Sequence, residues 1–440
     1  MPAFRFFRIL LLSLALAWGM VGPVSPAPAQ PVDEPPSPFG LGAYLHRVST
    51  QPRLLEKVAD LAARTGAGWT REEFNWNLIE PRPGEYHQPS LAALDRVVEE
   101  AAARGMEVVG LITGVSNWSS GGMAPSTEAQ FRDFAGFVTF VVDRYRGRIR
   151  YWEIWNEPNT DLFWPPKANP ADYVRLLTLA AAAAREVNPG VRIIGGSVAE
   201  LKDLLFVFSL FLLGAGEAMD ILSVHPYTSP KPLENSPAEL NLSLLPGLTG
   251  LFGPPKPIWV TEIGFPTCLG SSGVDETGQA ELLVRAYLSL LATGVETAAW
   301  YDLRDDGLDP WNCEDRFGLV THQEDLIPLR PKPAFSAFGT MTGLLAGLDF
   351  SRRLELGPGR RGLVFESFWA GSQTLVLWLV TDPAQESDGQ RTETLKLALS
   401  GRVDSVVDLF GRPYDHSFDG RTLSLTLSGS PVYVQGRFQP

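Results

Sequence analysis

The segment Ile149–Asn159 reads IRYWEIWNEPN, a largely apolar run that closes on a glutamate, Glu157. A second segment of the same kind, Pro257–Phe265, reads PIWVTEIGF and carries Glu262 near its end. Runs that are mainly apolar, without strict alternation, are typical of parallel strands covered on both faces. A carboxylate at the mouth of a buried strand is costly because it is poorly solvated there. We therefore expect both glutamates to have a chemical role.

The same pattern of a short apolar run followed by a helix-period segment repeats eight times between Phe39 and Gly347. The predicted strands are Phe39–Leu45, Ala67–Thr70, Glu107–Thr113, Arg150–Trp155, Val191–Gly196, Asp220–Val224, Ile258–Thr261 and Glu296–Tyr301. Helices are predicted at Pro52–Ala63, Leu91–Ala103, Thr127–Tyr145, Ala171–Val187, Leu201–Leu213, Thr277–Ala292 and Pro333–Leu345, with a poorly marked one inside Pro237–Leu248. Eight such repeats predict an α/β fold, a (β/α)₈ TIM barrel over residues 39–347. An open doubly wound sheet is the alternative.

The pattern changes in residues 348–440, where short strands alternate with Gly, Asp, Pro and Ser. Strands are predicted at Arg353–Leu356, Gly362–Phe368, Thr374–Val380, Thr394–Leu399, Val403–Asp408, Leu423–Leu427 and Val432–Gln435. This spacing predicts a C-terminal antiparallel β-sandwich, which we interpret as an accessory domain for stability or binding.

The first 29 residues have the features of a secretory signal peptide. Arg5 and Arg8 form a basic start, Ile9–Ala17 is an apolar core, and Ala27–Ala29 offers small residues for cleavage. An N-terminal membrane anchor is the alternative, but the apolar run is short for a span of about 20 residues. Residues 30–38 are rich in Pro and read as a linker. We expect a secreted or periplasmic protein with no membrane span after cleavage.

Composition narrows the range of partners. The 440 residues are 45% hydrophobic and carry a net charge of −13, so the chain is globular and has no surplus of Lys and Arg to bind nucleic acid. The same balance disfavours acidic polysaccharides. The two cysteines, Cys268 and Cys313, follow strands seven and eight. Export permits a disulfide between them, with two unpaired thiols as the alternative.

Active sites of (β/α)₈ barrels gather at the C-terminal ends of the strands. Glu157 falls at the end of the fourth predicted strand and Glu262 at the end of the seventh, so the two side chains are expected to face each other across the barrel mouth. Two carboxyl groups about 5–5.5 Å apart cleave a glycosidic bond with retention of configuration, whereas about 6.5–9.5 Å leads to inversion. The sequence predicts the closer pair.

The motif Trp155-Asn156-Glu157-Pro158 and the segment Trp259-Val260-Thr261-Glu262 resemble the two signatures of the clan A retaining glycoside hydrolases, most closely families thirty-nine and five. The resemblance covers Phe39 to about Gly347 and extends to the accessory sandwich. It implies an exported glycosidase that works by double displacement on an oligosaccharide, polysaccharide or glycoside. In this assignment Glu157 is the acid/base and Glu262 the nucleophile.

The resemblance also implies roles for neighbouring residues. Asn156 would bind the sugar 2-hydroxyl, and Arg71 would contact the nucleophile and keep it ionised. On the sixth strand, His225 and Tyr227 would line the site, with Tyr227 bonded to the nucleophile. Trp300 on strand eight resembles the aromatic platform for a sugar face, with a barrel-core tryptophan as the alternative, and Trp118 is a second candidate platform.

Several alternatives stay open. The acidic cluster between Asp302 and Asp315 could bind Ca²⁺, but its spacing lacks the EF-hand pattern, so a solvated loop is favoured and no metal or cofactor is predicted. The barrel could also act as a transglycosylase, or bind carbohydrate without turnover. The sugar, the anomer and the oligomeric state are not defined by these motifs.

Overall fold

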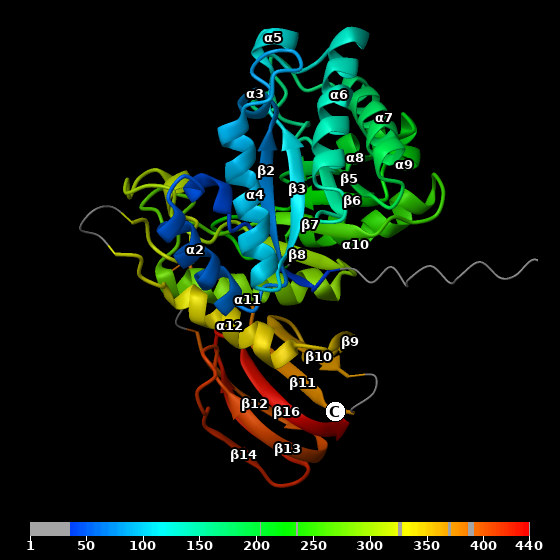
Figure 1. Cartoon of the computed structure of the whole chain (residues 1–440). Helices are drawn as coiled ribbons and strands as arrows, with labels where there is room; N and C mark the ends of the chain where they lie inside the picture. The colour runs from blue at the N-terminus through cyan, green and yellow to red at the C-terminus, as the bar shows by residue number, and fades with distance from the viewer. Residues whose placement is uncertain are drawn as a thin grey trace, which may run out of the picture. The chain divides into compact units, whose positions relative to one another are not determined.

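The computed structural model describes residues 36–202, 204–234, 236–323, 328–367, 371–385 and 391–439. The predicted signal peptide and most of the linker lie outside these residues. Eight parallel strands close into a barrel, with β1 paired to both β2 and β8 (Figure 1). The strands are β1 Phe39–Leu41, β2 Trp69–Asn75, β3 Glu107–Thr113, β4 Tyr151–Ile154, β5 Arg192–Ala199, β6 Ile221–His225, β7 Ile258–Ile263 and β8 Thr297–Trp300. The predicted fold class is confirmed.

Helices follow the barrel strands as expected. They are α2 Pro52–Arg64, α4 Gln88–Ala103, α6 Glu128–Arg144, α7 Pro170–Val187, α8 Leu205–Leu212, α10 Pro237–Gly250, α11 Glu276–Ala292 and α12 Pro333–Leu345. Side-chain caps mark several starts: Thr127 and Gln130 form a capping box at α6, and Asp275 accepts the backbone N–H of Gly278 at α11. Short helical turns that the sequence did not reveal are η1 Leu45–Val48, α3 Trp76–Ile79, α5 Asn117–Ser120, α9 Ala215–Ala218 and η2 Cys313–Arg316.

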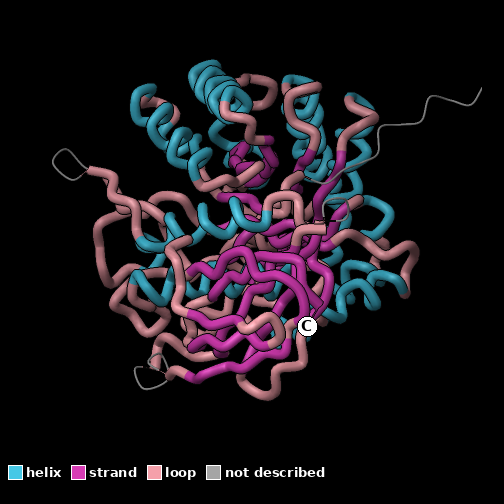
Figure 2. Tube along the Cα trace, turned by 90° about the horizontal axis from the view of Figure 1, so that it is seen from below, coloured by secondary structure: helices cyan, strands magenta, loops and turns pink. Residues whose placement is uncertain are grey.

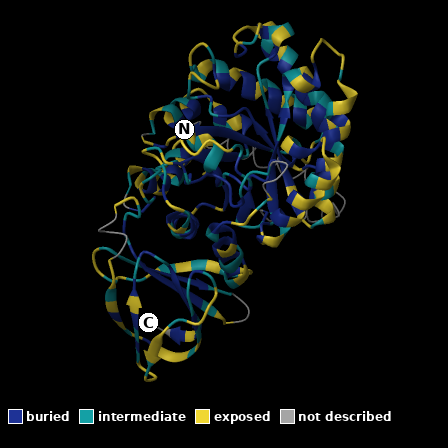
Figure 3. Cartoon of the chain, turned by 90° about the vertical axis from the view of Figure 1, so that its left-hand side faces the viewer, coloured by how far each residue is buried: buried dark blue, intermediate teal, exposed yellow. Residues whose placement is uncertain are grey.

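A compact layer of side chains fills the barrel interior. Each of β2 to β8 contributes one buried residue to it: Trp69, Val109, Tyr151, Ile194, Ile221, Trp259 and Ala299. On β1 the residue at this level is Gly40, and the indole of Trp69 fills the space beside it: a Cβ on Gly40 would lie 2.1 Å from that ring. Figure 3 shows the buried strands in dark blue and exposed faces of the surrounding helices in yellow. The layer closes the barrel toward the starts of the strands and leaves the C-terminal mouth for a site.

Helix α8 corrects one expectation. Its apolar sequence predicts a buried barrel helix, but only Val207, Leu210 and Phe211 are buried. The opposite face exposes leucines, with Leu205 72% exposed. Within the described ranges, no helix is both long and apolar enough to cross a bilayer.

The C-terminal segment forms two antiparallel sheets, seen as the strands around the C-terminus in Figure 2. The first, in the order β13-β16-β11-β10-β9, contains β9 Asp349–Arg353, β10 Arg360–Glu366, β11 Gln373–Leu379, β13 Ser400–Val407 and β16 Val432–Gln439. The second, in the order β12-β15-β14, contains β12 Glu393–Ala398, β14 His416–Phe418 and β15 Thr422–Leu427. Apolar side chains from both sheets form a core of their own.

Two edge strands of this segment were placed wrongly or missed. The strand predicted at Arg353–Leu356 ends where the prediction starts it, and His416–Phe418 was not predicted at all. Both strands are largely exposed, so the apolar alternation that marks a half-buried strand is weak in them.

A buried polar cluster joins the barrel to the sandwich. Glu234, 3% exposed, accepts hydrogen bonds from Arg285 Nε and from the indole of Trp378, both at 2.8 Å. Arg285 also donates to the carbonyl of Thr381 at 2.8 Å. A buried carboxylate with a charged partner is costly to break, so this cluster fixes the contact between the two parts.

Candidate functional site: a carboxylate pair at the barrel mouth

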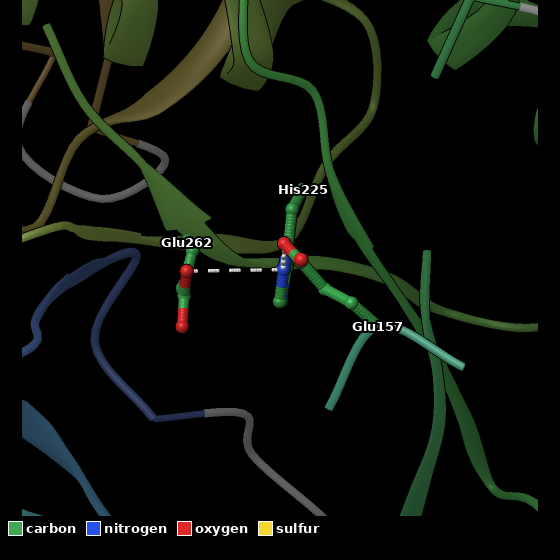
Figure 4. Close-up of side chains that lie close together, drawn as sticks. All are labelled: Glu157, His225 and Glu262. Carbon is green, nitrogen blue, oxygen red and sulfur yellow. Dashed lines mark hydrogen bonds and ion pairs between the residues drawn. The ribbon is translucent and has the colours of Figure 1, made fainter. Parts of the chain in front are cut away.

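Glu157 and Glu262 meet at the C-terminal mouth of the barrel. Glu157 lies three residues after the end of β4, and Glu262 is the penultimate residue of β7. One oxygen of each carboxylate and a ring nitrogen of His225 all lie within 4.8 Å of one another. Figure 4 shows His225 between the two glutamates. The two glutamates line a cavity of about 1080 Å³, to which residues at or after the C-terminal ends of all eight strands contribute.

Glu262 is held as an anion by three donors. Its Oε1 accepts from Arg71 Nη1 and, at 3.0 Å, from the hydroxyl of Tyr44, while its Oε2 accepts from Tyr227 at 2.9 Å. Burial acts to raise the pKa of Glu262, but Arg71, His225 and the two tyrosine hydroxyls outweigh it, and the pKa lies below its ordinary value. The predicted contacts of Arg71 and Tyr227 with Glu262 are present.

Arg71 is itself fixed by a third carboxylate, Glu153 on β4. Both side chains are almost fully buried, and Arg71 Nε lies 2.5 Å from Glu153 Oε2. The hydroxyls of Ser197 and Thr261 donate to Glu153 Oε1 at 2.6 and 2.7 Å. Burial works against this anion, but Arg71, His225 and the hydroxyls keep the pKa of Glu153 below its usual range.

The hydrogen bonds around His225 define where its protons lie. Thr261 gives its only hydroxyl hydrogen to the ionised Glu153, so its oxygen must accept from His225 Nε2, 2.9 Å away. Nε2 therefore carries a hydrogen. The other ring nitrogen, Nδ1, lies 2.9 Å from Glu157 Oε1. A bond there requires one proton, either on Glu157 with a neutral ring or on Nδ1 beside an ionised Glu157. The pair holds a shared proton next to the cavity.

The backbone is strained around the same cavity. Trp155 and Glu157 have φ values of 70° and 43°, and Tyr44 and Glu200 have 45° and 53°. These are left-handed conformations that residues other than glycine adopt at a cost, and all four residues line the cavity. Such strain commonly gathers where a site must hold side chains in fixed positions.

Asn156 lies in the site as predicted. It lines the cavity, is 8% exposed, and its Oδ1 accepts from Arg71 Nη2 at 2.9 Å. This bond leaves the amide nitrogen of Asn156 as the group available to a ligand.

The two tryptophan platforms are not where the sequence suggested. Trp300 is fully buried, donates to the carbonyl of Phe317 and packs near Phe265, so it presents no face to the cavity. Its neighbour Tyr301 lines the cavity instead. Trp118 also lies outside the lining: its indole donates to the carbonyl of Glu80 and its ring packs edge-on against Trp76. The Trp300 prediction was wrong about which side of the chain faces the site, and Trp118 is not among the residues that line the cavity.

The acidic loop after β8 is not simply solvated. Asp302 and Asp305 are 3% and 0% exposed, and they pair with Arg47 at 3.3 Å and Lys332 at 2.7 Å. Among the described residues, the group of His, Cys, Asp or Glu whose ligand atoms gather closely is Glu157, His225 and Glu262, and these atoms already bond to each other or to neighbours. Cys268 and Cys313 form the expected disulfide, and Cys313 lies on the cavity rim.

Sequence reasoning missed four residues of the site: Tyr44, Glu153, Thr261 and Tyr301. Glu153 lies in the fourth-strand segment, four positions before Glu157, and Thr261 lies in the seventh-strand segment, one position before Glu262. A polar side chain inside an apolar strand could have identified both residues as candidates for the site. Tyr44 and Tyr301 have no comparable feature in the sequence.

Comparisons with known proteins fit this geometry. No family model matches the chain. A segment of 124 residues is 32% identical to a β-xylosidase from Geobacillus stearothermophilus, and the match covers 26% of this chain and 24% of that relative. The chain thus matches about a quarter of the curated relative's length.

Solved structures match over nearly the whole chain. One is a family 39 glycoside hydrolase from Bacteroides cellulosilyticus, with a TM-score of 0.77 and 22% identity over 91% of this chain and 81% of that one. The fold is that of the family 39 glycoside hydrolases. A monomeric β-xylosidase from Caulobacter crescentus is also similar in fold, with a TM-score of 0.59 and 16% identity over 91% of this chain and 94% of that one. The resemblance expected from the two glutamate motifs is therefore confirmed at the level of the fold.

Proposed function

We propose that this protein is an exported retaining glycosidase, with Glu262 as nucleophile and Glu157 as acid/base. The observation that carries the proposal is the carboxylate pair. Oxygens of the two groups lie within 4.8 Å, which corresponds to the close spacing of retaining enzymes. One carboxylate is kept ionised by Arg71, and the other shares a proton with His225. With that proton on Glu157, the two groups have the opposite protonation states that the reaction requires.

The reaction has two displacements. In the first, a Glu262 oxygen bonds to the anomeric carbon while the bond to the leaving group breaks and Glu157 gives its proton to the departing oxygen. In the second, Glu157 takes a proton from water, the water oxygen bonds to the anomeric carbon, and the ester to Glu262 breaks. Configuration is inverted twice and so retained. Asn156 would bind a sugar hydroxyl beside the reacting carbon, a role that its position in the cavity lining supports.

The substrate is proposed to be a neutral glycoside. Five carboxylates line the cavity: Glu73, Glu157, Glu200, Glu262 and Glu314. Its two arginines are engaged, Arg47 with Asp302 and Asp306, and Arg71 with Glu153 and Glu262. A uronic acid would meet repulsion without an available cation. Since relatives in fold are named β-xylosidases, β-xylosides are the first substrates to test.

Export is part of the same proposal. Residues 1–29 would be cleaved, and the product would be secreted or periplasmic. The Cys268–Cys313 disulfide supports this, because such bonds persist in oxidising compartments. The mass of the protein recovered from culture medium or periplasm, compared with that of the full chain, tests the cleavage.

A panel of aryl glycosides of neutral sugars tests the activity. The parent is expected to hydrolyse at least one, and Glu262→Gln to lose more than about 10³-fold in kcat. The matched control is Glu186→Gln, an exposed glutamate on α7, which should behave as the parent. Unchanged activity in Glu262→Gln would remove the nucleophile assignment. Transfer of the sugar to an added alcohol in place of water would favour a transglycosylase. Binding of a glycoside without turnover would favour a barrel that binds carbohydrate and is not catalytic.

A further inference from the structure

One wall of the cavity is apolar and exposed. Leu78, Leu162 and Phe163 line it and are 63%, 79% and 39% exposed, with Val115 and Pro165 beside them. Single exposed leucines are ordinary on protein surfaces. Here the apolar side chains come from three separate loops, after β2, β3 and β4, and converge on one concavity. Convergence of apolar groups in a pocket with a few polar groups marks a ligand surface.

This wall lies on the Glu157 side of the site. Leu162 and Phe163 follow Glu157 in the same loop, which folds back on itself: Thr160 N donates to the Glu157 carbonyl at 3.0 Å, and the indole of Trp155 donates to the Phe163 carbonyl at 2.9 Å. The acid must touch the oxygen of the leaving group. A group attached to that oxygen therefore extends toward the loop that carries Glu157.

The wall is also preformed. The backbone N–H of Asn117, at the start of α5, donates to Asn77 Oδ1 in α3 at 3.0 Å. Ala124 N donates to the carbonyl of Pro165 at 2.9 Å and ties the β3 loop to the β4 loop. Figure 1 shows α3 and α5 at the same end of the barrel. Because these loops are already joined, a ligand loses little affinity to ordering them.

Several polar groups near this wall are already hydrogen-bonded to other parts of the protein. Asn75 accepts from Leu78 N and donates to Glu73, and Asn77 accepts from Asn117 N. The tryptophan in the lining, Trp155, is 1% exposed and offers no stacking face. An alkyl or aryl group would cover this exposed apolar surface, whereas a second sugar ring would set hydroxyl groups against leucine and phenylalanine side chains.

We infer that the leaving-group subsite of this protein accepts an apolar aglycone, so that its substrates are alkyl or aryl glycosides in preference to oligosaccharides. The inference rests on the proposed function, since it takes Glu157 as the acid. The cavity volume of about 1080 Å³ leaves room for such a group beside the sugar.

The test compares methyl and octyl β-xylosides, with xylobiose alongside, and uses β-glucosides if the aryl panel selects glucose. The parent is expected to cleave the octyl glycoside with a kcat/KM at least about tenfold above that of the methyl glycoside. Replacing Leu78 and Leu162 by Ser together should remove most of this advantage and leave the methyl glycoside unchanged. The control is Leu205→Ser, an equally exposed leucine on α8 outside the cavity.

Equal kcat/KM for methyl and octyl glycosides, a clear preference for xylobiose, or an octyl advantage that survives both replacements would overturn the inference. A binding measurement distinguishes failure of the apolar-aglycone inference from failure of the proposed glycosidase function. Octyl and methyl 1-thio-β-xylosides are titrated against Glu262→Gln by calorimetry. Tighter octyl binding that depends on Leu78 and Leu162 supports the wall even if no glycoside is hydrolysed, and equal affinities contradict it.

Discussion

Arg71 Nε lies 2.5 Å from Glu153 Oε2 inside the barrel, and the same guanidinium reaches Glu262 through Nη1. Glu153 therefore balances the charge of Arg71 and orients it toward the proposed nucleophile. On its other oxygen Glu153 accepts from Thr261, whose oxygen faces His225 Nε2. A continuous chain of hydrogen bonds thus runs from Glu157 through His225, Thr261, Glu153 and Arg71 to Glu262.

Glu153→Gln should destabilise the protein by about 3 kcal/mol, because it leaves the buried Arg71 without its charged partner. Since the pKa of Glu153 lies below its ordinary value, this stability is present at neutral pH and is lost as the pH falls through that lowered pKa. Denaturant unfolding of parent and variant at pH 7 and at acidic pH measures both effects. Glu99→Gln, exposed on α4, is the control. Equal stabilities of parent and Glu153→Gln at pH 7 would contradict this role.

Much of the barrel was predictable because most of its strands are mainly apolar and most of its helices begin at or next to proline or a capping residue. Glu107–Thr113 and Pro333–Leu345 have the predicted bounds. Glu157, Glu262, Arg71, Asn156, His225 and Tyr227 also meet as expected, since strand order alone brings strand ends to one mouth. The side on which a residue faces was not predictable for Trp300 and Tyr301. Adjacent residues of a strand point to opposite faces, so an error of one position exchanges the core and the cavity.

Removal of the acid should depend on the leaving group. Glu157→Ala is expected to lose about 10²–10⁴-fold in kcat/KM on alkyl glycosides, whose departing oxygen needs a proton. A 2,4-dinitrophenyl glycoside leaves without protonation, so its first displacement should change little. Steady-state kcat/KM on both substrates measures the contrast. Equal losses on the two substrates would show that Glu157 has another role.

The pH profile should be bell-shaped. Glu262 must be ionised, so activity falls as the pH drops through its lowered pKa, and the basic limb reflects the need for a protonated acid. Tyr227→Phe removes a hydrogen bond that lowers the pKa of Glu262, so the acidic limb should move to higher pH while the basic limb stays. A loss of about tenfold in kcat/KM is expected.

Tyr414→Phe is the matched control for this profile, because the Tyr414 hydroxyl bonds only within the sandwich, to the carbonyl of Thr426. Its profile should overlay that of the parent. An acidic limb that does not move in Tyr227→Phe would mean that this hydroxyl does not act on Glu262.

The disulfide should stabilise the fold. Cys268 and Cys313 are 45 residues apart, and in the chain-entropy model a bridge of that span contributes about 4 kcal/mol. The double replacement by Ser should lower the free energy of unfolding by about 2–4 kcal/mol in guanidinium titrations. Dithiothreitol should lower the stability of the parent similarly and leave the double variant unchanged. Equal stability of the parent with and without dithiothreitol would contradict a stabilising role for the disulfide.

Under the proposed function, Glu262 forms a covalent bond to the sugar. A 2,4-dinitrophenyl 2-deoxy-2-fluoroglycoside of the accepted sugar slows the breakdown of that bond, because fluorine destabilises the oxocarbenium-like transition states while the activated leaving group keeps the first step measurable. Mass spectrometry of the intact protein and of its peptides after this treatment locates the bond. We expect one added fluorosugar, on Glu262, in the peptide that carries Trp259-Val260-Thr261-Glu262. A fluorosugar attached to any other residue would contradict it.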